Sequence, residues 1–122
     1  MFGSKPILIV EDEPLIAMAL ADAVKGLDGL VIGPIATVSE ALDFLDCHEI
    51  AGAILDARLL DAEITPVALR LARAGIPVVV HSGTGLPAEV AAEWPGLPLL
   101  MKPTSPEVVA RRLLIEMTGR QR

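Results

Sequence analysis

The segment Gly52-Ala53-Ile54-Leu55-Asp56 decides the fold of this chain. Residues 50–55 form a short, continuous apolar run that gives way at once to charged residues, a pattern typical of a strand buried on both faces of a sheet. Ligands of open parallel sheets bind beyond the carboxyl ends of the strands, so Asp56 is expected at the mouth of a site. A single acid after a strand is more often a loop residue or a helix cap. The functional interpretation therefore depends on the residues at the ends of the other strands.

Strand and helix signals alternate on both sides of this segment. Apolar runs predict four further strands over residues 6–10, 30–35, 76–80 and 97–101. Apolar residues at helical spacing, early prolines and capping residues predict five helices, ending near residues 25, 47, 73, 93 and 118. Thr37-Val38-Ser39-Glu40 matches a capping box and gives the clearest helix start. The alternation predicts a doubly wound α/β fold, in which a five-stranded parallel sheet lies between helices joined by right-handed crossovers.

The composition excludes several classes of function. The chain has 122 residues, the size of a single domain, and is 52% hydrophobic, yet it has no apolar run near the roughly 18 residues that span a bilayer. A formal charge of −6 argues against a nucleic-acid surface, since only the C-terminal segment with Arg111, Arg112, Arg120 and Arg122 is basic. Cys47 is the only cysteine and no secretory signal is recognisable. These features predict a cytoplasmic protein that binds neither membranes nor nucleic acids.

Polar residues stand at the ends of four of the predicted strands, at the edge where ligands bind. They are Glu11 and Asp12, Asp56, Ser82 and Lys102. Three ionised carboxylates repel one another at neutral pH, so a hard divalent cation such as Mg²⁺ is the natural way to hold them together. A lysine and a hydroxyl beside that cation can bind phosphoryl oxygens. Each residue alone is explained by capping, a turn or surface exposure, but the combination indicates a site for phosphoryl chemistry.

Four stretches of the chain resemble the signatures of response-regulator receiver domains. They are Ile7-Leu8-Ile9-Val10-Glu11-Asp12-Glu13-Pro14, Ile54-Leu55-Asp56, Pro77-Val78-Val79-Val80-His81-Ser82-Gly83 and Met101-Lys102-Pro103. The resemblance covers practically the whole chain. It implies a flavodoxin-like (β/α)5 fold with strand order 2-1-3-4-5, and a protein that is not an enzyme beyond its own phosphorylation and dephosphorylation.

The resemblance also implies residue roles. Asp56 would accept a phosphoryl group from a histidine kinase or phosphotransfer protein, Ser82 would be the switch hydroxyl and Lys102 would contact the phosphoryl group. The peptide bond between Lys102 and Pro103 would be cis. Four residues would bind Mg²⁺: the carboxylates of Glu11, Asp12 and Asp56, and the backbone carbonyl of Arg58.

Three departures from the family pattern concern the switch and the loop after Asp56. Leu99 stands where the second switch residue is commonly aromatic. The long cationic side chain of Arg58 is open to four interpretations: pairing with an acid, assisting phosphoryl binding, hindering water attack, or facing solvent as an ordinary loop residue. Residues 59–65 lack the Pro-Gly turn often found after the phosphoacceptor.

The expected domain is a single receiver over residues 1–122 with no output domain, so it would act through other proteins. Three modes of action are open: passing phosphate along a relay, draining it as a sink, or binding a downstream target reversibly. The family's usual partner or dimer face is formed by the fourth helix, fifth strand and fifth helix. Four apolar residues of the last helix are candidates for that face, although core packing explains most of them: Val108, Val109, Leu113 and Met117. Trp94 is interpreted as local packing rather than as a partner contact.

Four other functions remain as alternatives. The strongest is a degenerate receiver that binds proteins without phosphorylation. A metal-dependent phosphatase with an aspartyl nucleophile usually has a second acid two residues later, where this chain has Arg58. A serine hydrolase built on His81 and Ser82 is disfavoured because adjacent strand residues point to opposite faces. Dinucleotide binding at Gly83-Thr84-Gly85 lacks the full glycine fingerprint.

Overall fold

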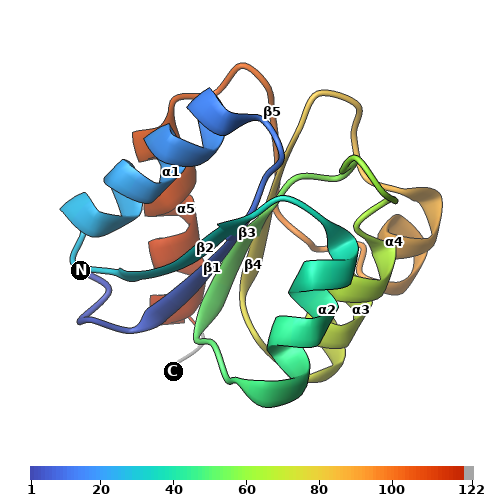
Figure 1. Cartoon of the computed structure of the whole chain (residues 1–122), viewed down its shortest axis with the longest axis horizontal. Coiled ribbons are helices and arrows are strands. Elements are labelled where there is room, and N and C mark those ends of the chain that lie inside the picture. Colours follow the sequence, from blue (N-terminus) through green and yellow to red (C-terminus); the bar gives the residue numbers. More distant parts are fainter. Residues whose placement is uncertain (120–122) are drawn as a thin grey trace.

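The computed structural model describes residues 1–119, so Arg120 and Arg122 of the basic C-terminal segment lie outside it. Five strands alternate with five helices in this part of the chain (Figure 1). In order they are β1 (Pro6–Val10), α1 (Pro14–Gly26), β2 (Leu30–Ile35), α2 (Val38–Cys47), β3 (Gly52–Leu55), α3 (Thr65–Arg73), β4 (Val78–Ser82), α4 (Ala88–Glu93), β5 (Leu99–Met101) and α5 (Pro106–Gly119).

All strand pairs are parallel and the sheet order is β2-β1-β3-β4-β5, which confirms the predicted fold class and strand order. The central strand β3 pairs with β1 on one side and with β4 on the other. Its last residue, Leu55, is opposite both Val10 and Val80. The residues just beyond these three strands are therefore delivered to one edge of the sheet.

Alternate residues of the strands point to opposite faces of the sheet and pack into two separate hydrophobic cores. Ile7 and Ile9 of β1 pack with α1 and α5, whereas Leu8 and Val10 pack on the other face with residues of α2, α3 and α4. Figure 1 shows the same two layers of helices on either side of the sheet. All four residues of β3 are buried, as predicted for a strand covered on both faces.

A glycine lets α5 approach the central strand. A Cβ placed on Gly52 would lie 2.8 Å from Sδ of Met117 and 3.4 Å from the nearest methyl carbons of Leu113. The first distance is shorter than carbon and sulfur atoms tolerate, so any larger residue at this position would push α5 away from β3.

The ends of several elements differ from the sequence prediction. β4 continues through His81 and Ser82, which were expected in a loop, because both pair with β5. β3 begins at Gly52 rather than residue 50, and β5 at Leu99 rather than residue 97. The predicted cap of α2 is confirmed, since Oγ1 of Thr37 accepts a hydrogen bond from the Glu40 N–H at 3.1 Å. The cis peptide between Lys102 and Pro103 is also confirmed.

The last helix contributes mainly to the core. Val109, Leu113 and Met117 are buried, while Val108 is 50% exposed and is the one residue of the four that is available to a partner. Trp94 is half-buried and packs against the core formed with α2, α3 and α4, as expected. Within residues 1–119 no helix is long and apolar enough to cross a membrane.

Candidate functional site

Three carboxylates meet at the carboxyl edge of the sheet. Glu11 and Asp12 come after β1 and Asp56 comes after β3, and the register that pairs Val10 with Leu55 brings them together. One carboxylate oxygen from each lies within 4.8 Å of the other two. Glu11 is only 3% exposed and Asp56 only 8%, whereas Asp12 is half-buried. The predicted convergence of the three acids is therefore present in the structure.

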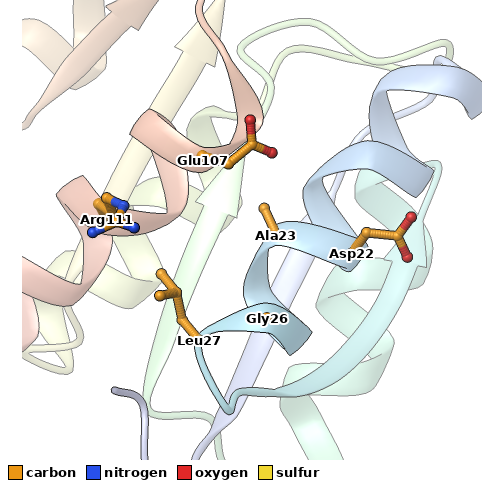
Figure 2. Close-up of a pocket in the computed structure, with 6 residues that line it drawn as sticks. All are labelled: Asp22, Ala23, Gly26, Leu27, Glu107 and Arg111. Carbon is orange, nitrogen blue, oxygen red and sulfur yellow. The ribbon is translucent and has the colours of Figure 1, made fainter.

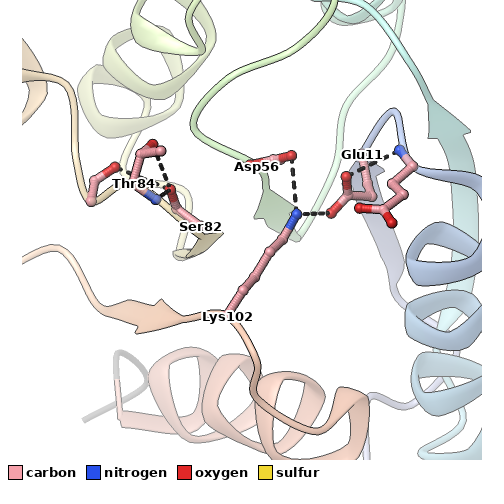
Figure 3. A network of polar contacts seen from close by, with 7 residues as sticks. Glu11, Asp56, Ser82, Thr84 and Lys102 are labelled. Carbon is pink, nitrogen blue, oxygen red and sulfur yellow. Dashed lines mark hydrogen bonds and ion pairs between the residues drawn. The ribbon is translucent and has the colours of Figure 1, made fainter.

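Lys102 joins two of these acids from the end of β5. Its Nζ lies 3.0 Å from Oε1 of Glu11 and 3.3 Å from Oδ2 of Asp56, as Figure 3 shows. Burial acts to lower the pKa of Lys102, but the hydrogen bond and charge of Glu11 and the charge of Asp56 outweigh it and raise that pKa. The lysine side chain is thus held as a cation over the two buried carboxylates.

The charges of this cluster do not balance. The pKa of Glu11 is raised to about 7, because burial and the nearby Asp56 act to raise it and together outweigh the opposing effect of Lys102. With all three acids ionised, a single ammonium leaves two negative charges uncompensated. A divalent cation supplies that charge, and an all-carboxylate ligand set suits a hard metal ion. The residues present therefore fit a Mg²⁺ site.

Ser82, the predicted switch hydroxyl, is buried at the end of β4 and bonded within its own loop. Its Oγ accepts a hydrogen bond from the Thr84 N–H at 3.0 Å and donates one to the Gly85 carbonyl oxygen at 3.2 Å. A second hydroxyl, Oγ1 of Thr84, lies 3.3 Å from the same atom. Figure 3 shows this group apart from the contacts made by Lys102. Thr84 was missed in the sequence as part of this group, although a serine hydroxyl commonly bonds the backbone two residues further on in a turn.

Arg58 and Leu99, the two unusual residues, have defined positions. The Arg58 guanidinium pairs with Glu63 at 3.4 Å, and both side chains are well exposed, so the structure supports a solvent-facing loop residue that pairs with an acid. Leu99 is half-buried in β5 and packs against the core formed with α2, α3 and α4. It has neither the size nor the polar group of an aromatic switch residue.

His81 lies on the opposite face of β4 from Ser82 and is only 3% exposed. Neither of its ring nitrogens has a hydrogen-bond partner among residues 1–119, which excludes a serine–histidine pair in the described part of the chain. The ring borders an apolar groove of about 280 Å³ between α1 and the segment after β5. Burial lowers the pKa of His81, the charge of Lys102 lowers it further and the charge of Asp56 offsets part of this effect.

A further hollow of about 270 Å³ lies between α1 and α5 and shares no lining residue with the site of Glu11, Asp12 and Asp56 (Figure 2). Its charged lining residues are Asp22, Glu107 and Arg111. None of the residues predicted from the sequence to form a site belongs to it, so the carboxylate edge of the sheet remains the candidate functional site.

These features define a flavodoxin-like α/β domain with a carboxylate and lysine site at the carboxyl edge of its sheet. Neither a protein-family model nor a curated protein matches the chain, but solved structures do. The solution structure of SdrG from Sphingomonas melonis Fr1 is 37% identical, and the match covers 97% of this chain and 99% of SdrG with a TM-score of 0.78.

Two more distant structures share the fold. A CheY-like response regulator receiver domain protein from Methanospirillum hungatei is 20% identical over 96% of each chain, with a TM-score of 0.79. The receiver domain of a sensor histidine kinase from Pseudomonas aeruginosa is 17% identical over 94% of this chain and 98% of its own, with a TM-score of 0.77, and holds a magnesium ion in its active-site cleft. The chain belongs to the response-regulator receiver domains of two-component signalling.

Proposed function

We propose that the domain accepts a phosphoryl group on Asp56 from the phosphohistidine of a histidine kinase or phosphotransfer protein, and then signals to a partner protein. The observation that supports this most directly is the contact of Lys102 with both Asp56 and Glu11, at 3.3 and 3.0 Å. A lysine in this position neutralises charge where phosphoryl oxygens would arrive.

The transfer needs only a nucleophile and charge compensation from the protein. An oxygen of Asp56 forms a bond to phosphorus while the bond from phosphorus to the donor nitrogen breaks, and the electron pair of that bond leaves with the imidazole. Lys102, freed from part of its contact with Asp56, moves with the negative charge onto the phosphoryl oxygens. No proton has to leave Asp56, because its carboxylate attacks in the ionised form.

We infer that Mg²⁺ is held by the carboxylates of Glu11, Asp12 and Asp56 and by the backbone carbonyl of Arg58. When bound, the cation would offset the excess negative charge of the acids and of the incoming phosphoryl oxygens. Lys102 holds two of these ligands in position, since its ammonium bridges Glu11 and Asp56.

The signal would pass through Ser82 and the surface beside it. Its hydroxyl would exchange the Gly85 carbonyl for a phosphoryl oxygen, which would release the loop that leads to α4. Leu99 offers no aromatic ring to accompany this movement, so the output would depend on the loop itself. The partner or dimer surface would comprise α4, β5 and α5, where Met101 and Val108 are about half exposed.

Intact mass spectrometry after incubation with acetyl phosphate tests this function. The wild type should gain one phosphoryl group only with Mg²⁺, and Asp56→Ala should gain none. Asp43→Ala, at an exposed position on α2, is the matched control and should behave as the wild type. If the wild type gains no phosphoryl group and binds no Mg²⁺ by calorimetry, the domain is instead a binding module that works without phosphorylation.

A further inference from the structure

The loop between β3 and α3 is fastened at its tip to another helix. The carboxylate of Asp61 accepts hydrogen bonds from the backbone N–H groups of Val38 at 2.9 Å and of Ser39 at 3.1 Å. These are the first two residues of α2, more than twenty positions away in the sequence. Asp61 therefore connects the segment after Asp56 to α2, a helix that contributes none of the three carboxylates of the candidate site.

The fastened loop begins directly after the proposed phosphoacceptor. Its two arms are joined by hydrogen bonds from the Ile64 N–H to the Ala57 carbonyl and from the Leu59 N–H to the Ala62 carbonyl, both at 2.9 Å. Leu59 and Ile64 are buried, so the arms are fixed to the core. Without Asp61, the tip of this hairpin would have no polar anchor to α2 among the contacts of residues 1–119.

The start of α2 is built to receive this carboxylate. A helix leaves its first amides without partners inside the helix, and Thr37 satisfies only the one from Glu40. Asp61 accepts hydrogen bonds from the two preceding amides, those of Val38 and Ser39. Its negative charge also interacts favourably with the positive end of the helix dipole. The hydrogen bonds from Val38 and Ser39 lower the pKa of Asp61, so it stays ionised at neutral pH.

We propose that Asp61 is a positioning residue that couples the phosphorylation site to α2. The hairpin that it anchors contains Arg58, whose carbonyl is the proposed fourth metal ligand, and it continues directly from Asp56. Displacement of the hairpin would move that carbonyl relative to the carboxylates. The inference rests on the proposed function of Asp56, and it adds a second route by which phosphorylation reaches the surface, separate from Ser82.

Coupling of this kind is reciprocal. If α2 stabilises the loop geometry that binds Mg²⁺, then Mg²⁺ must stabilise the contact between Asp61 and α2 by the same free energy. The amides of Val38 and Ser39 should therefore respond when Mg²⁺ binds, although neither residue belongs to the metal site.

The experiment compares three variants of the full chain. Asp61→Ala removes both acceptors, and Asp61→Asn keeps one carbonyl oxygen and serves as the conservative rescue. Asp46→Ala is the matched control, because Asp46 is an exposed aspartate of α2 whose ion pair with Arg70, at 2.7 Å, involves neither the loop nor the acids. Circular dichroism melting first establishes that each variant is folded at the assay temperature.

Phosphorylation by acetyl phosphate is then measured across a Mg²⁺ titration. For Asp61→Ala the Mg²⁺ concentration at half-maximal rate should rise about 2- to 30-fold, the range typical of residues that couple to a site without contacting it. Asp61→Asn should lie between it and the wild type, and Asp46→Ala should match the wild type. In amide spectra, Val38 and Ser39 should shift with Mg²⁺ in the wild type but not in Asp61→Ala.

The outcomes separate this inference from the proposed function. If the wild type is phosphorylated and Asp61→Ala shows the same Mg²⁺ dependence with only a lower melting temperature, Asp61 merely caps α2 and the inference is overturned. If the wild type is not phosphorylated at all, the proposed function fails first. Loss of the amide response in Asp46→Ala as well would also contradict a specific role for Asp61.

Discussion

Replacement of His81 by leucine should stabilise the protein. The imidazole is only 3% exposed, and both ring nitrogens lack hydrogen-bond partners among residues 1–119. A neutral imidazole has one donor and one acceptor, and each buried group left unpaired costs about 1–3 kcal/mol. Leucine removes both and matches the apolar lining of the neighbouring groove, which includes Leu15, Ile16 and Ala19.

The expected net gain at pH 7.5 is about 1–3 kcal/mol, because imperfect repacking of the new side chain offsets part of the benefit. For a domain of this size, each kcal/mol corresponds to roughly 3–5 °C in melting temperature. Urea titration monitored by circular dichroism measures the free energy of unfolding directly. His48→Leu is the matched control, because His48 is exposed and its ring already bonds to the Phe44 carbonyl.

The stability gained by His81→Leu should increase as the pH falls. Burial first, and then the charge of Lys102, lower the pKa of His81 below its ordinary value of 6.5. Below pH 6.5 the unfolded chain therefore takes up a proton that the folded protein does not, so the wild type loses stability, by at most about 1.4 kcal/mol per pH unit. His81→Leu removes this dependence. An equal or lower stability of the variant at pH 7.5, or a gain that does not change between pH 7.5 and 5.5, would refute the reasoning.

Two further substitutions test the packing and the electrostatics of the site. Gly52→Val should lower the free energy of unfolding by about 1–3 kcal/mol, because its side chain would collide with Met117, and Gly96→Val, in open space, should stay within about 0.5 kcal/mol of the wild type. Equal losses in urea titrations would contradict the close approach of α5. Lys102→Met should cost about 2–4 kcal/mol in EDTA, since it leaves two buried carboxylates without their cation. Added Mg²⁺ should restore part of that loss, and an unchanged stability in EDTA would show that the ion pairs contribute nothing.

The sequence was sufficient for the architecture because the signals were local. Each strand is a short apolar run, and parallel pairing is implied by the alternation with helices. The end of β4 was placed two residues early because His81 and Ser82 are polar and precede a glycine-rich stretch. Their strand conformation comes from pairing with Leu100 and Met101, a contact between segments that no local pattern reveals.

The site was predictable in part for the same reason. Glu11, Asp56 and Lys102 each come directly after a strand, so the sheet order alone brings them together. The hydrogen bonds of Asp61 to Val38 and Ser39 were not predictable, because they depend on how a loop folds across the start of a distant helix. In the sequence, Asp61 is one acid among 16 acidic residues.

The acids at the carboxyl edge of the sheet lower the stability of the fold, which indicates that they serve another role. A carboxylate such as that of Glu11, 3% exposed with a pKa raised to about 7, is destabilised by its position in the fold. A packing role would be served better by an apolar residue. Glu11 does accept a hydrogen bond from the N–H of Glu13, the N-cap residue of α1, at 3.2 Å, but a neutral serine or asparagine can make such a bond without burying a charge. Glu11 also lies 3.0 Å from Lys102, which holds Asp56 as well. A cluster that costs stability and leaves negative charge uncompensated is typical of a functional site, and it supports the proposed binding of a cation and a phosphoryl group.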